Sequence, residues 1–321
     1  MVGRFMERNA MNPLVSVIIP NYNYAQYLDE RMRSILNQTY QNFEIIILDD
    51  CSTDNSVDVI EKYRSHPKVS HIVYNEKNTG STWKQWDRGI SLTKGELIWI
   101  AEADDSCEAT FLEELVQGYV LNPQCTFMYS DIMRIDENGN EMNKRYSDDI
   151  RTMISGERFI RNYLAFDFVI VNISSVVFSR KAVVEIGKEY IDWGHGWLFC
   201  IAVAERGCVF HVRKQLDLFR RHGGSFTSLR DIDGRNVKLE RRIYDYLVQK
   251  GYINYLSRIL VKAKRRWRCI NIEYQSKEIE ERCYRLWGIT SSNKKYIGWI
   301  MRLSNRWVGH IRHKDLTKYK I

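Results

Sequence analysis

The sequence has no apolar run long enough to cross a membrane as a helix. Its longest apolar stretches, such as Val15–Ile19 and Ile45–Leu48, have the length of strands, whereas a membrane-spanning helix needs about 20 apolar residues. Arg4 and Arg8 lie near the N-terminus without an apolar segment behind them, so we expect no secretory signal. These absences favour a globular protein in the cytoplasm.

The cysteines are scattered along the chain, and prolines are few. The seven cysteines contain no C-x-x-C pair, which argues against a zinc site or a dithiol redox site. We expect unpaired, buried or inert thiols in a reducing compartment. Because there are only four prolines, no Pro-rich linker divides the chain.

No glycine-rich phosphate loop comes after the first apolar stretch. Neither G-x-G-x-x-G nor G-x-x-x-x-G-K-[ST] occurs there, which argues against a dinucleotide-binding dehydrogenase and a P-loop enzyme. A sugar nucleotidyltransferase would also need a basic, glycine-rich loop at this place, and Pro20–Tyr27 contains no glycine.

The apolar pattern that is present alternates between strand and helix. We predict strands over Val15–Ile19, Ile45–Leu48, Val69–Tyr74, Leu97–Ala101 and Cys125–Tyr129. We predict helices between them over Tyr27–Asn37, Val57–Tyr63, Trp83–Leu92 and Thr110–Leu121. Repeated β-α-β units with short apolar strands are typical of an α/β fold, in which helices cover a mostly parallel sheet.

Acidic residues come directly after two of the predicted strands. Asp49 and Asp50 end one of them, and Glu102, Asp104 and Asp105 end another. Ligands of α/β proteins bind at the carboxyl ends of strands, and Mg²⁺ or Mn²⁺ takes oxygen ligands and bridges to phosphates. The alternative is that these side chains form turns or cap the next helices along the chain.

A further polar segment, Pro20–Asn23, ends the first strand. Tyr22 could stack on a planar base, or it could be an ordinary packed aromatic residue in a turn.

Taken together, these segments resemble the family 2 glycosyltransferases, which have the Rossmann-like GT-A fold. The resemblance covers roughly residues 13–225 and rests on several motifs in the expected order, which are Pro13–Asn23, Ser34–Tyr40, Phe43–Asp54, Asn78–Ser81 and Lys94–Asp105. It implies an inverting transfer of a sugar from a nucleotide diphosphate to an acceptor hydroxyl, with UDP favoured by family tendency. It also implies dependence on Mn²⁺ or Mg²⁺.

The resemblance assigns roles to individual residues. Pro20 and Tyr22 would line the nucleobase pocket, and Asp50 would contact the base. Asp104 would contact the ribose or the metal, and Asp105 would bind the metal on the diphosphate. The chain departs from many relatives at Gln85–Gly89, where Lys84 or Arg88 could replace a missing cation.

Two residues compete for the role of catalytic base. Asp192, in the segment Ile191–Leu198, resembles the carboxylate that precedes the family's Ala-Glu-Arg-Gly helix end, although a gap is needed to align the residues after it. His195, whose side chain titrates near neutral pH, is the alternative. We favour Asp192.

The segment Phe219–Ser225 resembles the family's closing motif. Arg220 and Arg221 could bind phosphates, and His222 could be a further metal ligand. The alternative is a basic turn on the surface.

Charge divides the chain into two parts. Residues 1–229 carry 25 Lys and Arg against 31 Asp and Glu, whereas residues 230–321 carry 23 against 9. We therefore predict a GT-A domain over 1–229, with a nucleotide-sugar half over about 13–130 and an acceptor half over about 131–229. We predict a basic helical region over 230–321.

The basic region suggests a partner. Lys262–Arg268 is densely cationic, and Ile297, Ile300, Met301, Ser304, Val308 and Ile311 recur at helical spacing. Such a helix could lie on the anionic inner face of the plasma membrane, where a lipid-linked acceptor is presented. It could equally pack on the catalytic domain. We expect no nucleic acid, because no recognition motif accompanies the charge.

The resulting hypothesis is an enzyme of surface-polysaccharide or glycan assembly with a glycan or lipid-linked acceptor. The alternative is an inactive protein on the same fold that binds a nucleotide sugar or a glycan.

Overall fold

The computed structural model describes residues 12–188, 196–222 and 232–321. The chain forms two compact units. Unit 1 contains the described residues up to Gly156, those of Ile170–Arg221, and Lys320–Ile321. Unit 2 contains Glu157–Val169 and the described part of His222–Tyr319. The C-terminal helical unit therefore also includes a short segment from the middle of the sequence.

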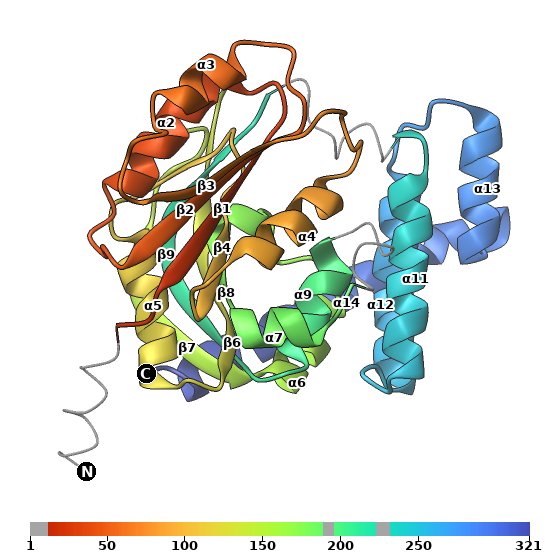
Figure 1. The fold of residues 1–321 in the computed structure, drawn as a ribbon. Coiled ribbons are helices and arrows are strands. Elements are labelled where there is room, and N and C mark those ends of the chain that lie inside the picture. The colour runs from red at the N-terminus through yellow and green to blue at the C-terminus, as the bar shows by residue number, and fades with distance from the viewer. Residues whose placement is uncertain (1–11, 189–195, 223–231) are drawn as a thin grey trace. The chain divides into compact units, whose positions relative to one another are not determined.

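The first half of unit 1 is a parallel sheet with helical connections (Figure 1). Its strands are β1 (Val15–Asn21), β2 (Phe43–Asp49), β3 (Val69–Tyr74) and β4 (Leu97–Ile100). The connecting helices are α2 (Ala25–Leu36), α3 (Ser56–Glu61) and α4 (Thr82–Leu92). β2 and β4 both pair in parallel with β1, so the ends of β2 and β4 flank the end of β1.

The second half extends the same sheet with strands of both directions. They are β5 (Ser106–Cys107), β6 (Cys125–Ile135), β7 (Ser147–Ser155), β8 (Val176–Ser179) and β9 (Cys208–Arg220). The strand order is β3-β2-β1-β4-β8-β6-β9-β5, and β7 also pairs with β9. β8 is antiparallel to β4 and β6, whereas β6 and β9 are parallel. This half is thus a mixed sheet.

Short helices connect these strands. They are α5 (Phe111–Leu121), α6 (Gly156–Phe159), the π-helical turn η1 (Ile160–Leu164), the 3₁₀ turn η2 (Ile173–Ser175), α7 (Arg180–Glu185) and α9 (Gly196–Ala204). α6 runs directly into η1, and η2 runs directly into β8.

Alternate residues of the central strands face different helical layers. Val15 and Val17 of β1 belong to a core with Leu28 of α2 and Leu115 of α5. Ile18 points the other way, toward Gly89 of α4, where an added Cβ would lie 2.4 Å from the Ile18 side chain. The sheet is therefore covered on both faces, as the alternating sequence pattern predicts.

Two cysteines do not match the expectation of unpaired thiols. Cys125 and Cys208 form a disulfide. They occupy paired register positions at the start of the neighbouring strands β6 and β9, with 4.4 Å between their Cα atoms. Because the two residues are 83 positions apart, spacing along the chain gave no sign of the pair.

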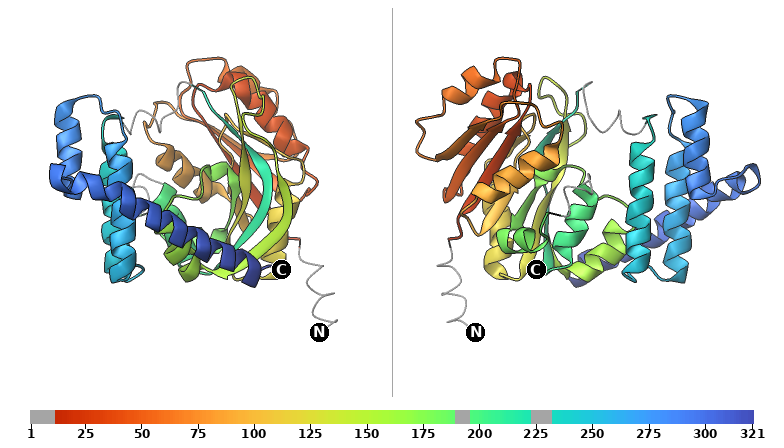
Figure 2. Two further views of the ribbon diagram at one scale, coloured as in Figure 1. Left: turned by 180° about the vertical axis from the view of Figure 1, so that it is seen from behind. Right: turned by 45° about the vertical axis from the view of Figure 1, so that its right-hand side comes forward.

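Unit 2 is helical. Its long helices are α11 (Arg235–Gln249), α12 (Tyr255–Ile270), α13 (Lys277–Trp287) and α14 (Ser291–Lys318), and α14 packs across α12 (Figure 2). A small core includes Val237, Cys269, Cys283, Trp287 and Ile297. None of the helices in the described ranges has the length and apolarity of a membrane span.

Candidate functional site

Polar side chains tie together the loops after β1 and β2. The Asn21 amide donates to the Asp49 carboxylate at 2.8 Å, and the hydroxyl of Ser52 donates to the same carboxylate at 2.6 Å. Asn23 and Cys51 have left-handed backbone conformations, with φ of 59° and 62°. Such conformations are uncommon for residues other than glycine, so these loops are held in place by their hydrogen bonds.

Asp50 lies at the centre of a second network. Its carboxylate accepts hydrogen bonds from the side chains of Asn75 (2.8 Å), Gln85 (2.7 Å) and Thr79 (2.8 Å), and from the Thr79 amide (3.0 Å). The Asp50 side chain is buried. The network fixes the start of α4 and the preceding loop beside the end of β2, where a base would bind if Asp50 has its predicted role.

The other predicted donor-binding residues of this edge belong to β1, to the loop after it and to α4. Pro20 is a buried residue of β1 whose register partner is Leu48. Tyr22 is 44% exposed, and Lys84 is exposed on α4. Asp54 accepts from the backbone amides of Ala25 and Ser56, so it stabilises the turn before α3.

Asp105 is the most constrained carboxylate of the loop after β4. It is buried and accepts from the side chains of Asn172 and Ser174, each at 2.7 Å, and from the backbone amide of Arg220 at 3.1 Å. Burial and the neighbouring Asp104 charge raise the pKa of Asp105 to about 6. It does not cap α5, which begins at Phe111 after Thr110.

Glu102 belongs to the same acidic loop. Its carboxylate accepts from the indole N–H of Trp86 at 3.1 Å. Burial, together with the charges of Asp104 and Asp105, raises the pKa of Glu102 to about 8. Burial and the same three acids also raise the pKa of Tyr24, in the loop after β1. The acidic loop and the end of β1 therefore share one electrostatic environment.

Sequence reasoning missed two buried charged residues that interact with this loop. Asp217 of β9 is fully buried, shares the donor Asn172 with Asp105, and has one carboxylate oxygen without a hydrogen-bond partner among the described residues. Burial and the charge of Asp105 raise the pKa of Asp217. The signal that could have revealed it is its place as the one acidic residue of β9, between Leu216 and Leu218.

A buried guanidinium partly compensates this negative charge. Arg31 of α2 is fully buried, and its guanidinium carbon lies 5.0 Å from the centre of the Trp99 ring. Its charge opposes the rise in pKa of Asp105 and Asp217. None of its guanidinium nitrogens has a hydrogen-bond partner within the described ranges. The signal that could have revealed it is helical spacing, because Arg31 comes three positions after Leu28 and four before Ile35 and so lies on the apolar face of α2.

Arg220 lies at the same site, and its guanidinium forms hydrogen bonds with other groups of the protein. Its guanidinium donates to the backbone oxygen of Asp104 at 2.8 Å and to the Glu30 carboxylate at 2.7 Å, and it lies 4.7 Å from the centre of the Tyr27 ring. It therefore holds the Asp104 backbone in place. Arg221 is exposed and His222 is partly buried.

The structure thus brings Asp104, Asp105 and Arg220 into one network and places Asp50 at the end of a strand on the other side of β1. Asp192 and His195 lie outside the described residues.

The acidic loop has ligand atoms that suit a divalent cation. Carboxylate oxygens are hard donors. Burial first, and then the crowding of acids, raise the pKa of Glu102 and Asp105, and a positive ion would relieve the crowding. The described residues contain no group of three or more His, Cys, Asp or Glu arranged as a metal site. An ion held here by one or two carboxylates would need further ligands from a bound molecule.

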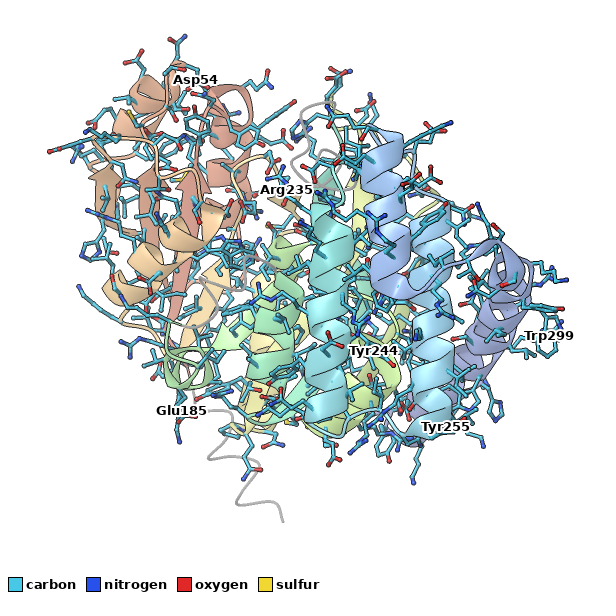
Figure 3. The ribbon with its side chains drawn as sticks, turned by 90° about the vertical axis from the view of Figure 1, so that its right-hand side faces the viewer. Asp54, Glu185, Arg235, Tyr244, Tyr255 and Trp299 are labelled. Carbon is cyan, nitrogen blue, oxygen red and sulfur yellow. A yellow bond between two sulfur atoms is a disulfide. The ribbon has the colours of Figure 1, made fainter. Side chains whose placement is uncertain are left out.

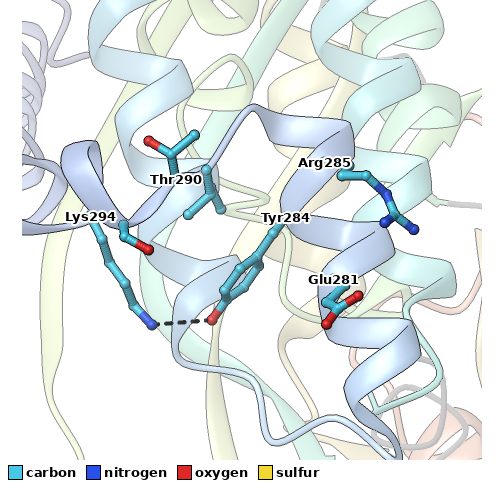
Figure 4. Close-up of a pocket in the computed structure, with 7 residues that line it drawn as sticks. Glu281, Tyr284, Arg285, Thr290 and Lys294 are labelled. Carbon is cyan, nitrogen blue, oxygen red and sulfur yellow. Dashed lines mark hydrogen bonds between the residues drawn. The ribbon is translucent and has the colours of Figure 1, made fainter.

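A pocket of about 350 Å³ lies elsewhere, in unit 2 (Figure 4). It is lined by Glu281, Tyr284, Arg285, Ile289, Thr290, Ser291 and Lys294. None of these residues was predicted to bind the donor, and the set lacks the carboxylate cluster that a diphosphate-bound cation needs.

The fold is shared with solved structures. Residues 1–349 of S. aureus TarS in complex with UDP-GlcNAc align with a TM-score of 0.63 and 15% identity, covering 94% of this chain and 91% of that one. The mannosyltransferase PcManGT from Pyrobaculum calidifontis, in complex with GDP-Man and Mn²⁺, aligns with a TM-score of 0.55 and 15% identity, covering 94% and 87%.

Residues 16–187 match Glycosyl transferase family 2. This match covers more than half of the 321 residues, so the chain belongs to that family, and the predicted resemblance is confirmed.

Curated relatives include the putative teichuronic acid biosynthesis glycosyltransferase TuaG of Bacillus subtilis, 30% identical over 41% of this chain and 52% of that protein. An uncharacterized glycosyltransferase of Haemophilus influenzae is 28% identical over 74% of this chain and 75% of that protein. The chain spans 52% of TuaG and 35% of the Streptococcus pneumoniae glycosyltransferase GlyG.

Proposed function

We propose that this protein transfers a sugar from a nucleotide diphosphate to an acceptor hydroxyl with inversion of configuration. The observation that carries the proposal is the crowded acidic loop Glu102–Asp105 at the end of β4, beside the end of β1, in a family 2 chain. Neighbouring carboxylates of raised pKa at the carboxyl end of a parallel strand are typical of a site that receives a cation and an anionic ligand.

Asp104 and Asp105 would hold Mn²⁺ or Mg²⁺, with His222 as a candidate further ligand. A cation bound there would neutralise the charge that grows on the departing nucleoside diphosphate. Asn172, Ser174 and the Arg220 amide orient the Asp105 carboxylate, so the protein fixes one ligand before the donor binds.

The nucleotide would lie on the other side of β1. Asp50 would accept from the base, with Pro20 and Tyr22 forming its pocket, and the exposed cations Lys84 and Arg221 would face the phosphates. Arg220 would act on the donor through the Asp104 backbone that it holds. A UDP-sugar is the donor we favour, and the shared fold of TarS in complex with UDP-GlcNAc supports this choice.

The acceptor hydroxyl would attack the sugar from the face opposite the diphosphate and lose its proton to Asp192, with His195 as the alternative base. We propose a glycan or lipid-linked acceptor in surface-polysaccharide assembly. The name of TuaG, which refers to teichuronic acid biosynthesis, supports this class. The cytoplasmic location stays a prediction.

Donor binding can be measured by thermal unfolding of the protein with a panel of UDP-, dTDP- and GDP-sugars, each with and without Mn²⁺. We expect one nucleotide class to raise the Tm and the rise to depend on Mn²⁺, because a ligand that binds only the folded state stabilises it by mass action. A panel in which no nucleotide sugar changes the Tm would contradict the proposal.

Catalysis can be separated from binding by measuring release of the nucleoside diphosphate. Asp192→Asn is expected to lower turnover by about 10²–10⁴-fold, the usual contribution of general acid–base catalysis, while the Tm rise with the donor is kept. His195→Gln should retain most of the activity. The reverse order of the two variants would assign the base to His195. Donor binding by the wild type without any turnover would favour the inactive binding protein.

A further inference from the structure

The predicted apolar face of α14 is mostly directed inward. Ile297, Ser304 and Val308 are buried, and Ile297 belongs to the small core of unit 2. These residues pack the helix on its own unit, which was the alternative to membrane contact. This face of α14 is therefore not available to a membrane surface.

The cationic segment Lys262–Arg268 is also largely used inside unit 2. Lys264 pairs with Asp167 at 2.7 Å, and Arg268 pairs with Glu240. Arg265 is buried, and Arg266 donates to the backbone oxygen of Trp287. Much of the basic charge that sequence analysis assigned to a surface therefore stabilises the helical packing.

A different face of α14 carries large apolar side chains that the structure leaves exposed. Tyr296, Trp299, Leu303 and Trp307 are 57%, 59%, 39% and 36% exposed. Their spacing of three, four and four residues places them along one side of the helix. Figure 3 shows the side chain of Trp299 directed away from the helices of unit 2. We call these four residues the aromatic stripe.

Basic residues accompany the aromatic stripe. Arg302 comes three positions after Trp299 and Arg306 three positions after Leu303, so each lies next to the stripe. Both are exposed, and the described residues include no ion pair for either. The one acidic residue of α14, Asp315, is 1% exposed and pairs with Arg158. The exposed surface of this helix therefore presents positive charge without carboxylates.

We propose that the aromatic stripe and its flanking arginines dock the protein on an anionic lipid surface, an interaction that goes beyond the proposed transfer reaction. Tryptophan and tyrosine prefer the boundary between headgroups and acyl chains, and a helix with basic residues beside such a stripe lies in that boundary. A second copy of this chain is a poorer occupant, because it would bring the same positive charges together. A soluble polyanion would attract the arginines but would not cover Leu303.

The test is flotation of the full chain with vesicles of phosphatidylcholine, alone or mixed with phosphatidylglycerol. We expect binding to the anionic vesicles only, weakened when salt reduces the Debye length to about 3 Å at 1 M. Trp299→Ser/Leu303→Ser and Arg302→Glu/Arg306→Glu should each lower the affinity by more than about tenfold, because the first removes apolar insertion and the second reverses charge at the surface.

Matched controls use exposed residues outside the stripe. Tyr255→Ser removes an aromatic side chain that is 82% exposed on α12, and Lys277→Glu/Arg282→Glu makes the same charge change on α13. Both should bind vesicles as the wild type does. Absence of binding to anionic vesicles, or equal losses in the stripe and control variants, would overturn the proposal. So would a dimer in solution that dissociates in Trp299→Ser/Leu303→Ser. Because this assay needs no donor, its outcome is independent of the transferase proposal.

Discussion

Asp105→Asn is expected to lower sugar transfer by about 10²–10³-fold, the scale on which loss of one electrostatic group at a reacting centre acts. The substitution keeps the side-chain size but removes the charge that would hold the cation. It also places an amide N–H₂ among donors, because Asn172, Ser174 and the Arg220 amide all point at this carboxylate. The measurement is release of the nucleoside diphosphate over a range of Mn²⁺ concentrations.

Two companion variants separate charge from folding. Asp104 is only partly buried, so Asp104→Asn should lose transfer while its Tm stays near that of the wild type. Asp58→Asn removes the same charge from an exposed position on α3 and should keep full activity. Transfer by Asp105→Asn within about threefold of the wild type would mean that this carboxylate does not act in the reaction, and the assignment of the site to Asp104 and Asp105 would be abandoned.

Gly156→Ala is expected to destabilise the protein by roughly 3 kcal/mol, the upper range for overpacking a close contact. A Cβ at Gly156 would lie 1.6 Å from the backbone oxygen of Ala204 and 2.6 Å from that of Gly207. The backbone cannot yield easily, because the Gly156 amide donates to the same Gly207 oxygen at 2.8 Å. Thermal or urea unfolding measures the loss, which should be seen as a lower midpoint or as insoluble protein.

Gly309→Ala is the matched control, because it adds the same methyl group within a helix where nothing lies within 4 Å. An exposed glycine inside a helix costs about 0.5–1 kcal/mol relative to alanine, so this variant should be slightly more stable than the wild type. The two substitutions should therefore have opposite signs. A wild-type midpoint for Gly156→Ala would show that the approach of Ala204 to this position does not constrain the fold.

Much of the first half of unit 1 could be predicted from its sequence. The spacing of apolar residues predicts strands such as Val15–Ile19 and the helices between them. Side chains that face the core recur every few residues along a strand or helix, so this pattern can be read from a short stretch of sequence. β4 ends at Ile100 and β2 at Asp49, so the acidic segments are found at the strand ends where they were predicted.

The sequence by itself determined the family, the alternation of strands and helices, and the acidic residues at the carboxyl ends of β2 and β4, because these features are local and ordered along the chain. Only the tertiary structure decided what surrounds them. Asn172 donates to both Asp105 and Asp217, Arg220 holds the Asp104 backbone, and Cys125 meets Cys208, although the partners are 45 or more positions apart in the sequence. The tertiary structure also decided that α14 buries Ile297 and exposes Trp299. Both faces of this helix carry apolar residues, and the packing of the other helices of unit 2 determines which face is buried.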